Sequence, residues 1–288
     1  MKNDSLNFVD AHVHFWDAAR MPYPWLAEVP SIAGAHGPAE LTAAAGAHSP
    51  AEIVFVESAV DPARALDEVR WVESFTDGPY VGAIVAQVAV DRGAETASTL
   101  AALGTEARVR GVRHNIQGEP DPGYCLRPEF VSGVRRVGAL GWTFDLCVKH
   151  EQLPACAELA RVCPETTFVL DHAGKPDIRG GMLDPWRADI AALARLPNVV
   201  CKLSGLVTEA DPAVWRPAAL RPYVDHLLGC FGAGRLLYGS DWPVVDLAAS
   251  YRRWLDAALE LLAALPEEQR AAIMCENTRR VYRMESAS

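Results

Sequence analysis

Residues 7–15 read NFVDAHVHF, a short apolar run that ends in two histidines two positions apart. A run of this kind after polar residues is typical of a buried β-strand. Because side chains alternate between the faces of a strand, His12 and His14 share one face. There the two imidazoles are close enough to bind one metal ion or one carbonyl oxygen. We expect Asp10 to face the other way, as a structural hydrogen-bond partner.

The rest of the chain repeats a unit of one strand and one helix. Apolar or β-branched runs bounded by turn residues predict eight strands, at residues 7–11, 53–58, 81–88, 110–114, 143–148, 167–171, 199–203 and 236–240. Amphipathic or alanine-rich segments predict helices at residues 38–47, 62–76, 95–107, 128–140, 151–163, 184–196, 212–230, 247–265 and 266–284. Strands that alternate with helices predict a parallel sheet, and eight such units predict a closed (β/α)8 TIM barrel.

Length and composition fit one domain that spans residues 1–288. Half of the residues are hydrophobic, enough for one large core. The formal net charge is −10 and the 27 basic residues are scattered, which argues against nucleic acid or an anionic membrane as a partner. The first residues lack the apolar stretch and cleavage site of a leader, so we expect a cytoplasmic protein. Seven cysteines without a Cys-x-x-Cys pair predict reduced thiols.

Polar and titratable residues gather where the predicted strands end. Catalytic groups of a (β/α)8 barrel lie at the C-terminal ends of its strands, so these residues are the candidates for chemistry. In addition to the two histidines of the first strand, the strand ends carry Glu57, Arg113, His114, Asn115, Asp171, His172, Lys202, Ser204, Ser240 and Asp241.

Asp241 lies in the segment YGSDWP at residues 238–243. An ionised aspartate at that place can hold a water molecule and take its proton when the water attacks an electrophilic carbon. His172, in FVLDHAGKP at residues 168–176, can orient that water, polarise a carbonyl group or complete a metal site. A lone histidine is more often a core residue, and Asp241 taken alone fits a helix cap or an ion pair. Their combination with His12 and His14 favours a catalytic set.

Three of these segments carry a family resemblance: the paired histidines of the first strand, AGKP after His172, and GSDWP around Asp241. They resemble the amidohydrolase superfamily, and within it the sugar-lactone hydrolases of the L-fuconolactonase and L-rhamnonolactonase type. Further segments similar to that branch are HFWD at residues 14–17, YPWL at 23–26, GVRHNIQ at 111–117 and CKLSG at 201–205. The resemblance implies a barrel of the metal-dependent-hydrolase type that opens a cyclic ester, such as L-fuconolactone, to the aldonic acid.

The chain departs from the superfamily at two metal-ligand positions. A binuclear centre uses a bridging lysine or glutamate at the end of the fourth strand, where this chain has Arg113, His114 and Asn115. His150 lies beyond the fifth strand, and we expect a surface loop residue there. The resemblance therefore implies at most one divalent ion, zinc first, held by His12, His14, His172 and Asp241, or no ion at all. In the metal-free alternative the three histidines polarise the carbonyl group, and Asp241 is the base in both cases.

The same resemblance suggests how a sugar lactone is bound. Arg113, His114, Asn115 and Gln117 offer donors and acceptors to hydroxyl groups, and Trp25, Trp16 and Trp242 offer aromatic faces to the ring. Core packing is an equally open alternative for Trp242 and for Trp16. The long loop at residues 15–37 is a candidate lid or substrate wall. Opposite charges also suggest that Lys202 pairs with Glu57.

Other functions remain open at this point. A metal-dependent decarboxylase or an amidase of the same superfamily would need a tightly held ion, which chelation would reveal. A non-catalytic sugar-acid-binding protein would bind without turnover. The intact set of His12, His14, His172 and Asp241 argues against that last alternative.

Overall fold

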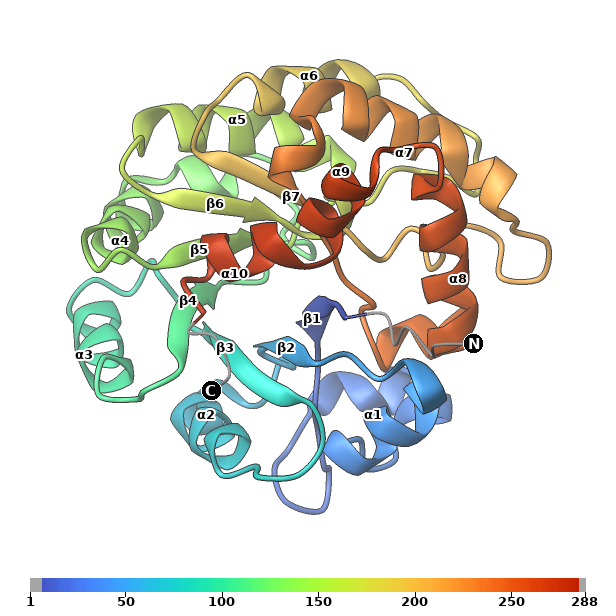
Figure 1. The fold of residues 1–288 in the computed structure, drawn as a ribbon. Helices are drawn as coiled ribbons and strands as arrows, with labels where there is room; N and C mark the ends of the chain where they lie inside the picture. The colour runs from blue at the N-terminus through green and yellow to red at the C-terminus, as the bar shows by residue number, and fades with distance from the viewer. Residues whose placement is uncertain (1–6, 285–288) are drawn as a thin grey trace.

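The computed structural model describes residues 7–284. Residues 1–6 and 285–288 lie outside this range. The prediction that the first residues do not form a leader therefore falls mostly outside the described residues. Eight parallel strands follow one another around a barrel in the order of the sequence (Figure 1). They are β1 Val9–Val13, β2 Glu52–Val56, β3 Tyr80–Gln87, β4 Val109–Arg113, β5 Thr143–Leu146, β6 Thr167–Leu170, β7 Val199–Leu203 and β8 Leu236–Tyr238.

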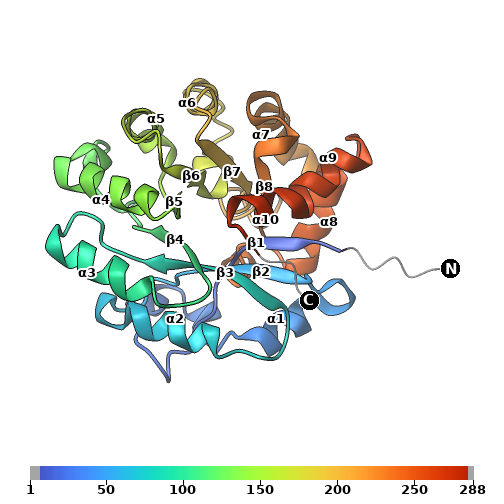
Figure 2. The ribbon, with the colours of Figure 1, turned by 60° about the vertical axis from the view of Figure 1, so that its left-hand side comes forward.

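Helices surround the barrel: α1 to α8 each follow one strand, and α9 and α10 come after α8 (Figures 1 and 2). They are α1 Pro38–Ala45, α2 Ala65–Glu73, α3 Ala94–Leu103, α4 Pro128–Ala139, α5 Leu153–Val162, α6 Trp186–Ala194, α7 Pro217–Phe231, α8 Tyr251–Leu262, α9 Glu267–Ala271 and α10 Asn277–Val281. Prolines open α1, α4 and α7, where the missing N–H would have no helical partner. The helix predicted at residues 266–284 is not continuous, because a π-helical segment, Ala272–Glu276, separates α9 from α10. The predicted (β/α)8 barrel is thus confirmed.

The barrel is closed between β1 and the segment that follows β8. The amide of Asp241 donates to the carbonyl oxygen of His12 at 2.9 Å, and the amide of His14 donates to that of Trp242 at 2.8 Å. Val13 and Trp242 form the corresponding parallel bridge. Because these bonds lie beyond the end of β8, the closure itself brings Asp241 next to the two histidines.

An irregularity in β1 decides which of its side chains face the site. The register of β1 against β2 shifts between Asp10 and Val13. Ala11 packs among the apolar side chains inside the barrel, whereas Asp10 accepts hydrogen bonds from the Ser240 amide at 2.8 Å and the Tyr251 hydroxyl at 3.0 Å. Strict alternation would have placed Asp10 and His12 on one face. The expected structural role of Asp10 is confirmed, and the bulge is its physical reason.

The end of the chain closes the N-terminal mouth of the barrel. In Figure 1, α9 and α10 cross the barrel near the start of β1. Cys275, Tyr282 and Met284 pack against the valines inside the barrel, and Arg279 pairs with Glu52 at 2.5 Å. All seven cysteines are unpaired, as expected. Among residues 7–284, no helix combines the length and apolar character that a bilayer crossing requires.

Candidate active site

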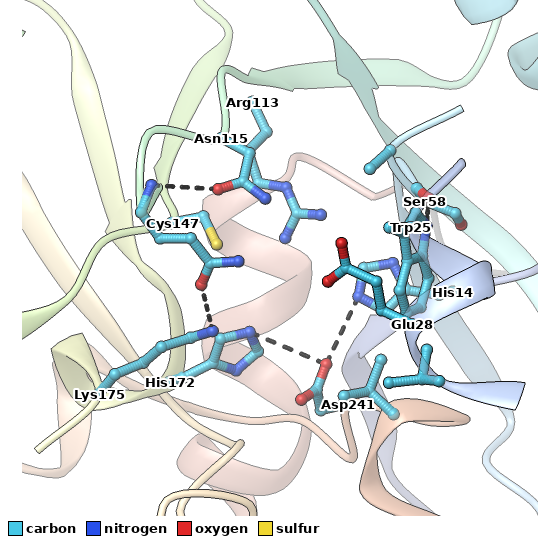
Figure 3. A pocket seen from close by; sticks show the side chains of 14 residues that line it. His14, Trp25, Glu28, Ser58, Arg113, Asn115, Cys147, His172, Lys175 and Asp241 are labelled. Atoms are coloured by element: carbon cyan, nitrogen blue, oxygen red, sulfur yellow. Dashed lines mark hydrogen bonds and ion pairs between the residues drawn. The ribbon is translucent and has the colours of Figure 1, made fainter. Parts of the chain in front are cut away.

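A cavity of about 310 Å³ opens at the C-terminal ends of the strands, where Figure 3 views it from close by. Its walls come from the loops after β1, β2, β4, β5, β6 and β8. The lining residues are His14, Trp25, Glu28, Val29, Ser58, Ala59, Arg113, Asn115, Gln117, Cys147, His172, Lys175, Asp241 and Val244. The site is therefore in the part of the fold where barrel enzymes place their chemistry.

Four side chains converge on one point at the base of this cavity. The Oδ1 atom of Asp241 is 3.4 Å from Nε2 of His14, 3.6 Å from Nε2 of His12 and 3.8 Å from Nε2 of His172. The two Nε2 atoms of His12 and His14 are 3.0 Å apart. The structure thus brings together the four residues that the sequence predicts as the catalytic set.

The outer nitrogens of the histidines are fixed by other groups. Nδ1 of His14 is 2.9 Å from the carbonyl oxygen of Val56, which can only accept, so Nδ1 carries the proton and Nε2 of a neutral ring offers its lone pair to the site. Nδ1 of His172 is 2.9 Å from the hydroxyl of Ser204. Both contacts orient the rings toward Asp241.

Burial and charge set the ionisation of the site. Burial lowers the pKa of His172 to about 4, and burial together with the Lys202 ammonium holds the pKa of His12 well below its usual value. Burial alone would raise the pKa of Asp241, but the nearby His172, His14 and His12 hold it well below its usual range. At neutral pH the site therefore pairs the carboxylate of Asp241 with the neutral imidazoles of His12 and His172.

The backbone around His172 and Asp241 is held in an uncommon conformation. His172 has a φ of 53° and Asp241 a φ of 63°, both in the left-handed region that side chains rarely adopt. Gly205 has a φ of 63°, and a β-carbon there would lie 2.6 Å from Nδ1 of His172. Only glycine leaves room for the observed position of the His172 ring.

We expect Gly205→Ala to reduce turnover by about 10²-fold, because the added methyl group displaces the His172 ring. The backbone alone should cost about 1–2 kcal/mol of stability. A matched control is Gly229→Ala in α7, where a β-carbon meets nothing within 4 Å. That variant should be fully active and as stable as the wild type or slightly more so. Steady-state kinetics and urea unfolding of both variants measure the two effects, and full activity in Gly205→Ala would contradict the steric argument.

A buried cluster of charges lies beneath the site. Nζ of Lys202 is 2.7 Å from Oδ2 of Asp145, 3.0 Å from Oδ1 of Asp171 and 3.1 Å from Nδ1 of His12. Glu57 instead pairs with Arg113, whose Nε lies 2.5 Å away. The predicted Lys202–Glu57 pair is wrong, because the forked guanidinium reaches Glu57 and Asp171 together while two aspartates surround the lysine.

Three of the converging groups fit a single divalent cation. Ligands 2.0–2.1 Å from a tetrahedral zinc ion are about 3.4 Å from one another, and the separations of 3.0, 3.4 and 3.6 Å among Nε2 of His12, Nε2 of His14 and Oδ1 of Asp241 lie around that value. His172 instead forms a second group of close ligand atoms with His12 and Asp171. Asp171, however, already binds Lys202 and Arg113. The donor set therefore supports one ion held by His12, His14 and Asp241, which leaves a coordination position for substrate or water.

Two residues that the sequence suggested for substrate binding do not line the cavity. Trp242 is 1% exposed and packs edge-to-face against Phe15 and His36 in the core. His114 stacks on Phe130 and lines a neighbouring cavity. Trp242 follows Asp241, and His114 follows Arg113. Because Asp241 and Arg113 face the site and side chains alternate along an extended chain, Trp242 and His114 point away from the site. The other four suggestions, Trp25, Arg113, Asn115 and Gln117, line the cavity.

The cavity also holds polar residues that the sequence prediction missed, namely Glu28, Ser58, Cys147 and Lys175. Nζ of Lys175 donates to Oε1 of Gln117 at 2.5 Å. Lys175 could have been found, because it belongs to the AGKP segment that follows His172. His150 is partly exposed beside Glu151, as expected for a loop residue.

Comparison with known proteins identifies the family to which this barrel belongs. The family described as Amidohydrolase matches residues 9–284. An L-fucono-1,5-lactonase of Burkholderia ambifaria is 33% identical over 255 residues, covering 86% of this chain and 85% of the relative. A second, of Burkholderia multivorans, is 34% identical over 274 residues, covering 87% and 89%. The chain belongs to the amidohydrolase family.

Solved structures give the same result. Crystal structures of an amidohydrolase from Burkholderia multivorans, one with bound HEPES and one with bound zinc, each give a TM-score of 0.86. Their sequence identity to this chain is 31%, and the match covers 97% of this chain and 100% of theirs. The predicted family and the prediction of a hydrolase are confirmed.

Proposed function

We propose that the protein hydrolyses the lactone of a neutral sugar acid to the open-chain acid. The observation that carries this proposal is the ionised Asp241 surrounded by three histidines at the base of a cavity with an aromatic and polar wall. Hydrolysis of an ester needs a base for water and a polarising group for the carbonyl oxygen. Both functions are available at this one point.

In the proposed reaction, Asp241 accepts a proton from water as the water oxygen bonds to the lactone carbonyl carbon. Nε2 of His12 and Nε2 of His172 can donate to the carbonyl oxygen as negative charge develops there, whereas Nε2 of His14 carries a lone pair and cannot donate. When the tetrahedral intermediate collapses, the bond to the ring oxygen breaks and Asp241 returns the proton to that oxygen. The product is a carboxylic acid with one new hydroxyl group, and the base is regenerated.

A divalent cation held by His12, His14 and Asp241 would act as a Lewis acid toward the carbonyl group. The relative with bound zinc makes zinc the first ion to test. In this version Asp241 still takes the proton from water, and the contacts of His14 with Val56 and of His172 with Ser204 still orient the rings.

The charges of the cavity favour a neutral substrate over a dicarboxylate. Arg113 is matched by Glu57 and Asp171, and Lys175 is bound to Gln117. Glu28 and Asp241 add two carboxylates to the lining. Among the residues lining the cavity, Lys175 is thus the one cation without an acidic partner that a substrate carboxylate could bind. Hydroxyl groups, which donate and accept, suit this surface better.

The test is acid release, followed with a pH indicator, over five- and six-membered aldonolactones with and without chelator. L-fucono-1,5-lactone is the first substrate to try, because two relatives are L-fucono-1,5-lactonases. We expect turnover of sugar lactones, about one equivalent of zinc per chain by elemental analysis, and activity that falls on chelation and returns with zinc. Turnover that persists without metal would leave the histidines alone as the polarising groups. Saturable binding without any turnover would support the non-catalytic alternative.

A further inference from the structure

Trp25 and Glu28 belong to one short structural unit at the mouth of the cavity. The middle of the long loop after β1 forms a 3-10 turn, Pro24–Glu28. In a 3-10 helix, side chains three positions apart lie on the same side. Trp25 and Glu28 have this spacing, and both line the active-site cavity.

The turn is firmly anchored to the rest of the protein. Nε1 of Trp25 donates to the carbonyl oxygen of Ser58 at 2.8 Å, and Leu26 between the two residues is buried. The Trp25 ring also packs edge-to-face on Trp16, whose own Nε1 donates to the carbonyl oxygen of Ile32 at 3.0 Å. These contacts hold the turn in place before any ligand binds, which lowers the entropic cost of binding.

The Glu28 carboxylate is left free to bind a ligand. Figure 3 shows it pointing into the cavity, between the side with Arg113 and the side with Asp241. Within residues 7–284, no hydrogen bond or ion pair engages this carboxylate, and Arg113 is already paired with Glu57 and Asp171. A carboxylate accepts hydrogen bonds at both oxygens and donates none.

We propose that Glu28 determines specificity by accepting hydrogen bonds from two neighbouring hydroxyl groups of the lactone, while the ring lies against Trp25. An aromatic face covers the apolar side of a sugar ring, and a carboxylate binds a pair of hydroxyls through charge-assisted hydrogen bonds. The proposal rests on the proposed lactonase function and adds its substrate class, a neutral lactone with adjacent hydroxyls. Glu28 binds the substrate and takes no part in proton transfer.

The test compares a hydroxylated and a bare lactone ring in the variants Glu28→Ala and Glu28→Gln. On L-fucono-1,5-lactone, we expect Glu28→Ala to lower kcat/KM by about 10- to 100-fold, chiefly through KM, because hydrogen bonds to a charged group are lost. On δ-valerolactone, which has the same ring without hydroxyls, the two enzymes should agree within about twofold. Glu28→Gln should fall between, because its amide retains one acceptor oxygen.

Glu268→Ala is the control, since it removes an acidic charge from an exposed position on α9. It should leave both substrates unaffected. An equal loss on both lactones in Glu28→Ala would overturn the proposal, because the residue would then act on catalysis or on the shape of the site. Unchanged kinetics on the hydroxylated lactone would overturn it as well.

A binding measurement separates this proposal from the lactonase function. L-fucono-1,5-lactam carries the same hydroxyls but no ester, and δ-valerolactam lacks them. Measured by calorimetry, Glu28→Ala should bind L-fucono-1,5-lactam about 10-fold or more weakly than the wild type does. Its affinity for δ-valerolactam should be unchanged. If the wild type hydrolyses no lactone yet shows this pattern, the lactonase function fails and the hydroxyl-binding role of Glu28 stands. Equal affinity of wild type and variant for the fuconolactam overturns the role of Glu28.

Discussion

Asp241→Asn is expected to lower kcat on the lactone substrate by about 10²- to 10⁴-fold. The amide cannot take a proton from water, and the substitution removes the negative charge of Asp241 from the point that the three histidines surround. The fold should survive, because asparagine tolerates the left-handed backbone that Asp241 adopts, with a φ of 63°. Acid release under saturating substrate measures the effect, and circular dichroism checks the fold.

Asp256→Asn serves as the matched control, since this aspartate lies on the surface of α8 and pairs only with Arg252 among the residues described. It should be as active as the wild type. Turnover near the wild-type level in Asp241→Asn would remove Asp241 from the role of base. Loss of activity together with loss of the folded signal would call for Asp241→Ser, which keeps a small polar group at the same place.

Lys202→Met should be the most destabilising of the substitutions considered, by about 3–5 kcal/mol. Burial alone lowers the pKa of Lys202, but the carboxylates of Asp145 and Asp171 raise it above its usual value, so the buried amine is charged. Methionine fills a similar volume and leaves the two carboxylates without their shared cation. Urea unfolding measures the loss of stability.

Lys175→Met is the control for stability, because Lys175 lines the cavity and bonds only to Gln117 within residues 7–284. Its unfolding free energy should change by less than about 1 kcal/mol. If Lys202→Met were as stable as the wild type, the cluster would not depend on the lysine charge. A Lys202→Arg variant should recover part of the lost stability, since it restores the cation with a different shape.

The arrangement of strands could be predicted closely because each strand is a short apolar run between turn residues. The strand at residues 199–203 matches β7 Val199–Leu203 in full. The grouping of the proposed catalytic residues could also be predicted, since His12, His14, His172 and Asp241 all lie at strand ends, and a barrel brings strand ends together. Local sequence and overall topology agree at these positions.

Side-chain direction and side-chain partners were harder to predict. Trp242 and His114 follow strand-end residues that face the site, and simple alternation would have directed them outward. The bulge in β1 breaks the same alternation at Asp10, so the rule alone is not sufficient. The pairing of Lys202 with Asp145 and Asp171 depends on distances across the barrel interior, which the spacing along the chain does not contain.

Glu28 shows a different limit of sequence reasoning. It belongs to a loop, and loops carry no periodic pattern that would mark its residues as lining a site. Only the three-residue spacing from Trp25, read as one 3-10 turn, would have pointed to it. That interpretation needs the turn to be known first.

The segment that closes the N-terminal mouth of the barrel links a late-synthesised part of the chain to the support of the site. The hydroxyl of Tyr282 donates to Oδ2 of Asp145 at 2.7 Å, the oxygen that also accepts from Lys202, and Lys202 reaches His12. All eight strands have been synthesised once the chain reaches Tyr238 at the end of β8, yet this oxygen then lacks one of its two donors. The hydrogen bonds that support the site are therefore complete only after residues far beyond the last strand have docked at the N-terminal mouth.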